Sequence, residues 1–206
     1  MSKNVTITKE MILASAFDIV REKGLEGISN RELAKKLNCS IRPIYYQFQN
    51  VEELYNELYV EIEKYFYKFL MDNMNDDMPK YKQVGLNYIK FAKEEKEFFK
   101  ILFMSEVDLG LNDFIAKDME DFKELSKLIK ISTNLNDEDI ESFHIKMWIF
   151  SHGLATLVAS STLNISDKQL KQLLSLEFQA LMLLKENPNN KWVLKNGVEK
   201  WKILEI

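Results

Sequence analysis

The stretch from Ser29 to Phe48, SNRELAKKLNCSIRPIYYQF, constrains the fold of this chain more than any other. Its first half carries apolar residues at helical spacing, which are Leu33, Ala34 and Leu37. Ser29 followed three residues later by Glu32 is the pattern of a capping box. Turn-forming side chains at 38–40 then interrupt the periodicity. The stretch therefore predicts two short helices joined by a tight turn.

The second of these predicted helices has few apolar side chains. Ile44 and Phe48 are four residues apart, so both can turn into the core. That spacing leaves Arg42, Tyr46 and Gln47 pointing away from the core. A short helix that is anchored from behind and presents Arg, Tyr and Gln to solvent suits insertion into the major groove of DNA.

The run RELAKKLNCSIRPIYYQF, followed by NVEELY, resembles the helix-turn-helix of the TetR family of repressors. The Leu-Ala pair, the small turn, the Ile-Tyr dipeptide, the closing Phe and the Glu-Glu-Leu-Tyr sequence all fall in register. The resemblance covers roughly residues 8–60, and it departs from the family pattern at Val51, where many members have a phosphate-binding Lys. It implies an all-α fold with a three-helix DNA-binding domain at 1–50 and a helical-bundle domain for ligand binding and dimerisation at 51–206.

The composition agrees with a mostly helical protein. The chain has 206 residues, of which 46% are hydrophobic, and it contains six Gly and three Pro, so helix breakers are few. The polar opening segment does not read as a signal peptide, and the most apolar stretch, 147–163, is interrupted and short for a membrane span. A single cysteine fits a reducing compartment. We expect a cytoplasmic protein without a membrane segment.

Charge is distributed unevenly along the chain. The net charge of −4 argues at first against a DNA-binding protein. Residues 1–50, however, hold eight basic and five acidic side chains, which leaves 20 basic and 27 acidic side chains in 51–206. A basic N-terminal domain on an acidic body fits a protein that touches phosphate at one end.

Eight residues form the predicted contact set for double-stranded DNA. They are Ser29, Arg31, Ser40, Arg42, Pro43, Tyr45, Tyr46 and Gln47. Arg42, Tyr46 and Gln47 are the candidates for base edges, since Arg can donate two hydrogen bonds to guanine. Ser29, Arg31, Tyr45 and also Lys9 are candidates for phosphate. The alternative is that these side chains are only solvated surface. Pro43 disfavours helical geometry at Arg42, so we expect the recognition helix to begin one or two residues late.

Caps and periodicity predict the remaining helices. We expect them at 9–23, from 51 over about five turns, and at 79–93, 113–131, 136–162 and 167–185. Thr8, Asn50 and Asn136 are the predicted caps, and Gly24 the predicted end of the first helix. The helix from 51 carries an apolar stripe, Leu54, Leu58, Ile62, Tyr65 and Phe69. It is either a spacer or a lever that moves the DNA-binding domain.

The helix at 167–185 is apolar around nearly its whole circumference. Such a helix must be buried on all sides, which predicts a homodimer through a four-helix interface made with the helix at 136–162. The family dimerises in this way. Ser151, Ala155, Ala159 and Thr162 form a stripe of small residues that would let a partner helix approach. The alternative is that this stripe packs within one subunit.

The pattern Trp148-x-x-x-His152-Gly153 resembles TetR-type effector domains. On this basis we predict a ligand cavity lined by Tyr88, Phe91, Phe99, Phe103, Met119, Phe122, Trp148 and His152. We expect a hydrophobic or aromatic ligand with few charges. The alternative is that these aromatic side chains simply fill the core.

Few residues suggest catalysis or metal binding. There is no Gly-rich phosphate loop and no HExxH motif. Glu141 and His144 would need a second Glu-x-x-His copy, and the acids at 137–139 are explained by helix capping. Cys39 reads as a small hydrophobe that fills an apolar position in the turn, and the alternative is a redox sensor beside the DNA. We therefore expect no metal, no cofactor and no enzymatic activity.

Together these features predict a TetR-type regulator, a repressor released from a palindromic operator by a small hydrophobic effector. Two alternatives make different predictions. An architectural or partner-binding DNA-binding protein that needs no ligand would have a solidly packed body. A small helical enzyme would have a buried cluster of ionisable groups with perturbed pKa values.

Overall fold

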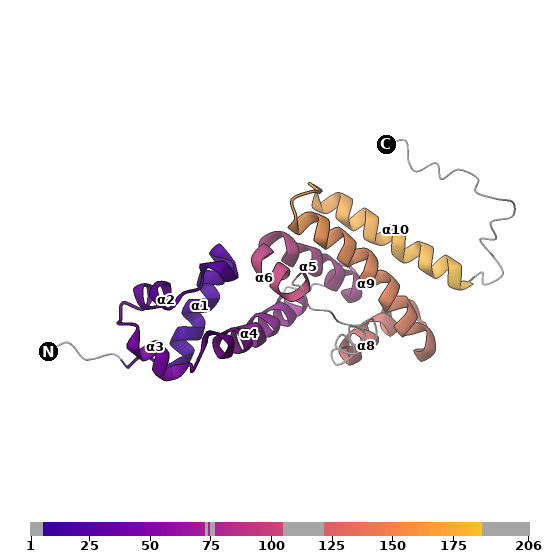
Figure 1. Ribbon diagram of the computed structural model, residues 1–206. Helices are drawn as coiled ribbons and strands as arrows, with labels where there is room; N and C mark the ends of the chain where they lie inside the picture. The colour runs from indigo at the N-terminus through magenta and orange to yellow at the C-terminus, as the bar shows by residue number, and fades with distance from the viewer. Residues whose placement is uncertain (1–5, 73, 75–76, 105–121, 187–206) are drawn as a thin grey trace, which may run out of the picture.

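The computed structural model describes residues 6–72, 74, 77–104 and 122–186. Over these ranges the chain is helical and contains no strand, which confirms the predicted all-α fold. In the same ranges, no helix is both long enough and apolar enough to cross a membrane. Figure 1 shows helices α1–α3 at one end of the molecule, α4 leading away from them, and α9 and α10 side by side at the other end.

The first helix, α1 (Lys9–Lys23), has the predicted ends. The Thr8 hydroxyl accepts a hydrogen bond from the Met11 amide at 3.3 Å. Gly24 has a φ of 72°, a left-handed value that favours glycine, and its N–H donates to the Val20 carbonyl. A short 3₁₀ turn, Leu25–Gly27, then leads into the helix-turn-helix.

The helix-turn-helix consists of α2 (Asn30–Lys36) and α3 (Arg42–Gln47). Asn38 takes a φ of 49° in the turn between them, a region that Asn tolerates well. The prediction of a late start for α3 is wrong, because Ile41 is already in the right-handed helical region and Arg42 is the first helical residue. Pro43 sits in the first turn, where a backbone N–H has no partner within the helix and its loss costs little.

The long helix α4 (Val51–Met71) joins the DNA-binding domain to the body. The Asn50 side chain caps it, accepting a hydrogen bond from the Glu53 amide at 2.8 Å. Its buried residues are Leu54, Leu58, Ile62, Phe66 and Leu70. The predicted stripe is therefore correct over its first three positions, but Phe66 and Leu70 replace Tyr65 and Phe69, which are half-buried. The buried positions keep a strict four-residue spacing, so the buried stripe winds slowly around a helix that has 3.6 residues per turn.

The body contains α5 (Lys80–Glu94), α6 (Lys96–Phe103), α8 (Phe122–Thr133), α9 (Asp137–Ala159) and α10 (Asp167–Glu186). The first part of the predicted helix at 113–131 and the C-terminal tail after 186 lie outside the described residues. Asn136 caps α9 as predicted, accepting from the Asp139 amide at 3.0 Å. The α5 and α9 helices pack along one another at the centre of the body.

The stripe of small residues on α9 faces into the subunit. Ser151, Ala155 and Ala159 are all buried, while Thr162 lies beyond the end of the helix and is exposed. Its predicted use in a dimer interface is therefore wrong, and the alternative of packing within one subunit is correct. Small side chains let α5 approach α9 closely, so the stripe serves the core of the single chain.

Candidate functional site

The outward face of α3 presents the side chains predicted to read DNA. Tyr45 and Tyr46 are 63% and 85% exposed, large values for aromatic residues, and Arg42 is exposed beside them. Behind them, Ile44 and Phe48 are only 2% and 3% exposed. The helix is thus fixed by apolar anchors and offers a guanidinium and two phenol groups to solvent, the arrangement a recognition helix requires.

The other predicted DNA contacts surround this face. Ser29, Arg31 and Ser40 are exposed, and Pro43 is half-buried. The Ser29 hydroxyl caps α2 by accepting from the Glu32 amide at 3.1 Å. The Glu32 carboxylate accepts from Lys23 Nζ at 3.3 Å, a contact that the capping-box pattern did not predict.

Two of the predicted contacts are held by other residues of the chain. The Gln47 side-chain amide donates to the Ile7 carbonyl at 3.2 Å, so it ties the segment before α1 to α3. Lys9 pairs with Glu57 and Glu53 of α4, and the hydrogen bond to Glu57 raises the pKa of this lysine. Sequence spacing could not reveal these contacts, because their partners lie about 40 residues away.

A cavity of about 100 Å³ lies in the body between α4, α5, α6, α8, α9 and α10. Its lining is mainly apolar and aromatic, and includes Phe66, Tyr67, Leu70, Tyr81, Val84, Tyr88, Phe103, Leu125, Met147, Trp148, Leu174 and Phe178. The polar groups of its wall include Lys82, His144 and Ser151. A mostly apolar cavity with a few polar groups is the usual form of a small-molecule site.

Three of the eight predicted ligand residues line this cavity, namely Tyr88, Phe103 and Trp148. Phe91 and Phe99 are fully buried in the core instead, as the alternative interpretation expected. His152 stacks on Trp148, with ring centroids 4.7 Å apart. Met119 and the side chain of Phe122 lie outside the described residues.

Two tyrosine–histidine pairs join α5 to α9. The Tyr81 hydroxyl lies 3.0 Å from His144 Nδ1, and the Tyr88 hydroxyl lies 2.8 Å from His152 Nδ1. Burial lowers the pKa of His152 below its usual 6.5, which favours the neutral ring at pH 7. The two tyrosines on α5 and the two histidines on α9 are each about two helical turns apart, a sequence signal that could have suggested this pairing. Within the described ranges, no group of three His, Cys, Asp or Glu side chains is placed to hold a metal ion.

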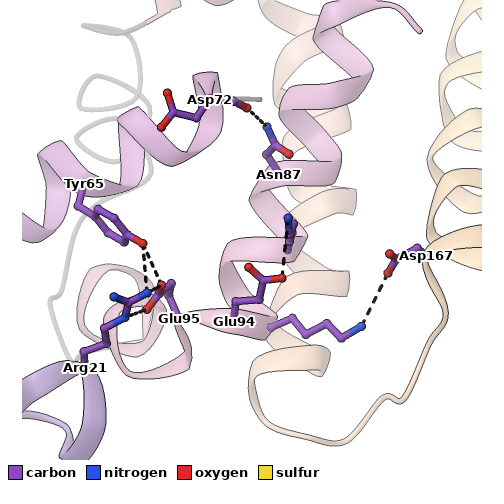
Figure 2. Close-up of polar contacts among 9 residues, drawn as sticks. Arg21, Tyr65, Asp72, Asn87, Glu94, Glu95 and Asp167 are labelled. Atoms are coloured by element: carbon purple, nitrogen blue, oxygen red, sulfur yellow. Dashed lines mark hydrogen bonds and ion pairs between the residues drawn. The ribbon is translucent and has the colours of Figure 1, made fainter. Parts of the chain in front are cut away.

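An ion pair between a buried carboxylate and a half-exposed guanidinium joins the DNA-binding domain to the body, and no sequence pattern indicated it. Glu95, which precedes α6, is 4% exposed and accepts hydrogen bonds from the guanidinium of Arg21 in α1 and, at 2.9 Å, from the Tyr65 hydroxyl of α4 (Figure 2). The hydrogen bond to Glu95 raises the pKa of Arg21, and burial, followed by the contact with Glu95, raises that of Tyr65. Three helices from both parts of the chain thus meet at one carboxylate.

One face of α9 and α10 is apolar and exposed in the single chain. Its members are Ile149 and Leu157 on α9 and Leu176, Leu183 and Leu184 on α10, each between 43% and 61% exposed. Gly153 lies between Ile149 and Leu157 on α9, and a Cβ atom added there would meet no atom within 4 Å. The α10 helix is therefore apolar on its outer side as well as its inner side.

Comparison with known proteins agrees with this arrangement. Residues 12–58 match the family described as bacterial regulatory proteins, tetR family. The chain is 27% identical over 139 residues to the biofilm operon icaADBC HTH-type negative transcriptional regulator IcaR of Staphylococcus epidermidis, a match that covers 66% of this chain and 69% of IcaR.

Solved structures share the fold along most of the chain. A TetR family protein from Vibrio parahaemolyticus superposes with a TM-score of 0.60 at 22% identity, covering 84% of this chain and 97% of that one. The TetR family protein ActR of Streptomyces coelicolor, solved in complex with (S)-DNPA, gives a TM-score of 0.52 at 17% identity, covering 86% and 98%. The N-terminal residues 12–58 therefore match the DNA-binding domain of the tetR family, and the chain as a whole shares its fold with solved TetR family proteins.

Proposed function

We propose that this protein is a homodimeric transcriptional repressor that binds a palindromic operator and is released from it by a small hydrophobic effector. The observation that carries the proposal is the exposed Arg42, Tyr45 and Tyr46 surface of α3, held from behind by two buried anchors. Repression rather than activation is supported by the similarity to IcaR, which is named a negative regulator.

The exposed apolar face of α9 and α10 supports a homodimer. Four leucines and one isoleucine exposed on these two helices are unfavourable in water, and a second copy would cover them with the same face in an isologous four-helix interface. Gly153 at the middle of this face leaves room for a partner helix to approach. The dimer would hold two recognition helices roughly 34–36 Å apart, or somewhat more on a longer site, so that both enter the major groove.

The cavity supports control by an effector, and the similarity in fold to ActR, which was solved with a bound small molecule, agrees with this. The α6 helix connects the cavity to the DNA-binding domain. Phe103 at its end lines the cavity, and Glu95 just before its start holds Arg21 of α1. A ligand that displaces α6 would therefore move α1 and α3. Such a ligand can release the protein from the operator only to the extent that it binds the displaced conformation more tightly than the DNA-binding conformation.

The two alternative functions are less well supported. A ligand-independent DNA-binding protein would have a solid body, whereas this body contains a cavity. A helical enzyme would have a buried ionisable cluster, and Arg21, Tyr65 and Glu95 do form one. These three groups satisfy one another at the domain junction, however, and they are absent from the described lining of the cavity, which suits a structural role.

Selection of binding sites from random double-stranded DNA tests the proposal. The expected product is a palindrome with two half-sites about one helical turn apart. Arg42→Ala should lose about 1–3 kcal/mol of specific binding and relax the preference at one base pair in each half-site. Lys64→Ala on the exposed side of α4 is the control and should select the same site. Failure to enrich any sequence, or an Arg42→Ala protein with unchanged affinity, would contradict the proposal.

A further inference from the structure

The cavity lining combines a cation that has no described carboxylate partner with a hydroxyl that has no described hydrogen-bond partner. Lys82 is the charged side chain among the described residues that line the cavity. Its ammonium donates to the Ser175 hydroxyl at 2.5 Å, and no carboxylate of the described chain lies within ion-pair distance of it. The Ser151 side chain is only 6% exposed and lines the same cavity, yet its hydroxyl makes no hydrogen bond within the described ranges.

The packing around Gly85 brings these two groups to the same end. Gly85 lies one turn after Lys82 on α5, and an ideal Cβ at Gly85 would be 3.9 Å from Ser151 Oγ and 3.7 Å from Leu174. Leu174 precedes Ser175, the hydrogen-bond partner of Lys82. The missing side chain at Gly85 therefore leaves space between α5, α9 and α10, with Lys82 and Ser151 beside it.

The Lys82 ammonium pairs with a neutral hydroxyl and with no described carboxylate, and the Ser151 hydroxyl has no described partner, so a ligand in the cavity can add a hydrogen bond to each. Both groups can donate a hydrogen bond, and an anion accepts from them more strongly than a neutral acceptor does. The rest of the lining is largely aromatic and aliphatic, and the volume of about 100 Å³ is on the scale of a cavity that holds a single aromatic ring.

We propose that this cavity binds a small aromatic monoanion, with its ring among the aromatic side chains and its acidic group accepting hydrogen bonds from Lys82 Nζ and Ser151 Oγ. The proposal rests on the proposed function, because it names the class of effector that the same cavity takes. A cationic ligand is disfavoured there, since Lys82 would repel it and no described carboxylate lines the cavity to pair with it.

Calorimetric titration with ligands that differ only in charge tests this class. The probes are benzoate, benzamide and benzylamine, together with the corresponding 2-naphthyl acid, amide and aminomethyl compound, so that ring size and charge vary separately. We expect the acids to bind at least about tenfold more tightly than the amides, and the amines to bind weakest.

Variants establish where the acid binds. Lys82→Met and Ser151→Ala should each lower the affinity for the acid about tenfold and change that for the amide much less. Gly85→Ala adds a methyl group at ordinary contact distances, so it should fold normally and still weaken binding by narrowing the polar end. Lys90→Met removes a lysine from the exposed side of the same helix and is the matched control, with unchanged affinity expected.

The proposal is overturned if amides or amines bind as tightly as the acids, if none of the six probes binds, or if the acids keep their affinity in the Lys82→Met and Ser151→Ala proteins. Operator binding by the same preparations separates this result from the proposed function. If the protein selects a palindrome but does not prefer the acids, the proposed ligand class is wrong and the proposed repressor function stands. If the protein prefers the acids but selects no DNA site, the proposed repressor function is wrong and the proposed ligand class stands.

Discussion

The carboxylate of Glu95, just before α6, accepts two hydrogen bonds from the guanidinium of Arg21 in α1, one of them at 2.7 Å from Nε. The two residues are 74 positions apart in the chain. Glu95 is almost fully buried, whereas the Arg21 side chain is about half exposed. The ion pair therefore fastens the DNA-binding domain to α6, whose last residue, Phe103, lines the cavity of the body (Figure 2).

Removing one member of this pair should destabilise the protein. Arg21→Met leaves the buried Glu95 carboxylate with the Tyr65 hydroxyl as its remaining described partner, and should lower the free energy of unfolding by about 2–3 kcal/mol in a urea titration at pH 7. The double variant with Glu95→Leu should recover part of this loss, because no buried charge then lacks a partner. Arg31→Met, on the exposed surface, is the control and should stay within about 0.5 kcal/mol of the parent protein. Equal stability of the Arg21→Met and parent proteins would show that the pair contributes little.

Charge on the exposed face of α10 should separate the subunits. Leu183 is 59% exposed in the single chain, so Leu183→Glu should leave the helices intact but place a carboxylate in the dimer interface. Sedimentation should then detect monomers, with operator affinity reduced because each monomer holds one recognition helix. Val60→Glu is the matched control, since Val60 is 44% exposed on α4 and lies outside this face. Persistence of the Leu183→Glu dimer would place the interface elsewhere.

Stability should fall in mildly acidic solution partly through His152. Burial lowers the pKa of this residue in the folded protein below its usual 6.5, so the unfolded chain binds its proton more readily. The stabilising contribution of the neutral ring is present above pH 6.5 and is lost as the pH falls from 6.5 through the lowered pKa. Urea titrations between pH 7.5 and 5 should therefore give a weaker pH dependence for His152→Gln than for the parent protein. Parallel curves for the two proteins would rule out this contribution.

Two glycine substitutions should have opposite effects on stability. Gly24→Ala should destabilise by about 1–2 kcal/mol, because φ is 72° and the new Cβ would lie 2.9 Å from Glu97 Oε2. Gly153→Ala lies within α9 with no neighbouring atom near the added Cβ, and should stabilise the chain by about 0.5–1 kcal/mol. Both are best measured in a Leu183→Glu background, so that dimerisation does not enter the unfolding free energy. The same sign for both substitutions would contradict this explanation.

The sequence predicted the start of a helix accurately where a side chain caps that helix by accepting a hydrogen bond from a backbone amide within one turn. Thr8, Ser29, Asn50 and Asn136 each cap the helix that the sequence assigned to them. Pro43 was misread, because the rule that disfavours helix before proline is weak at a helix start. The exposed surface of α3 was predictable for the same local reason, since Ile44 and Phe48 fix which side faces inward.

The lining of the cavity was predicted less well. An aromatic side chain has the same pattern in sequence whether it fills the core, as Phe91 and Phe99 do, or borders empty space, as Phe103 and Trp148 do. Only the positions of neighbouring helices distinguish the two cases. Tyr81, Lys82 and Ser151 were missed because a single polar residue on a buried helix face has no periodic signal of its own.

The sequence by itself determined the helical fold, the capped helix-turn-helix and the apolar character of α10, because these depend on interactions among residues within a few positions of one another. Only the tertiary structure decided which face of α9 turns inward, where the chain leaves a cavity, and that Arg21 meets Glu95. Those outcomes depend on how whole helices pack, and packing brings together side chains whose separation along the chain carries no information about their distance in space.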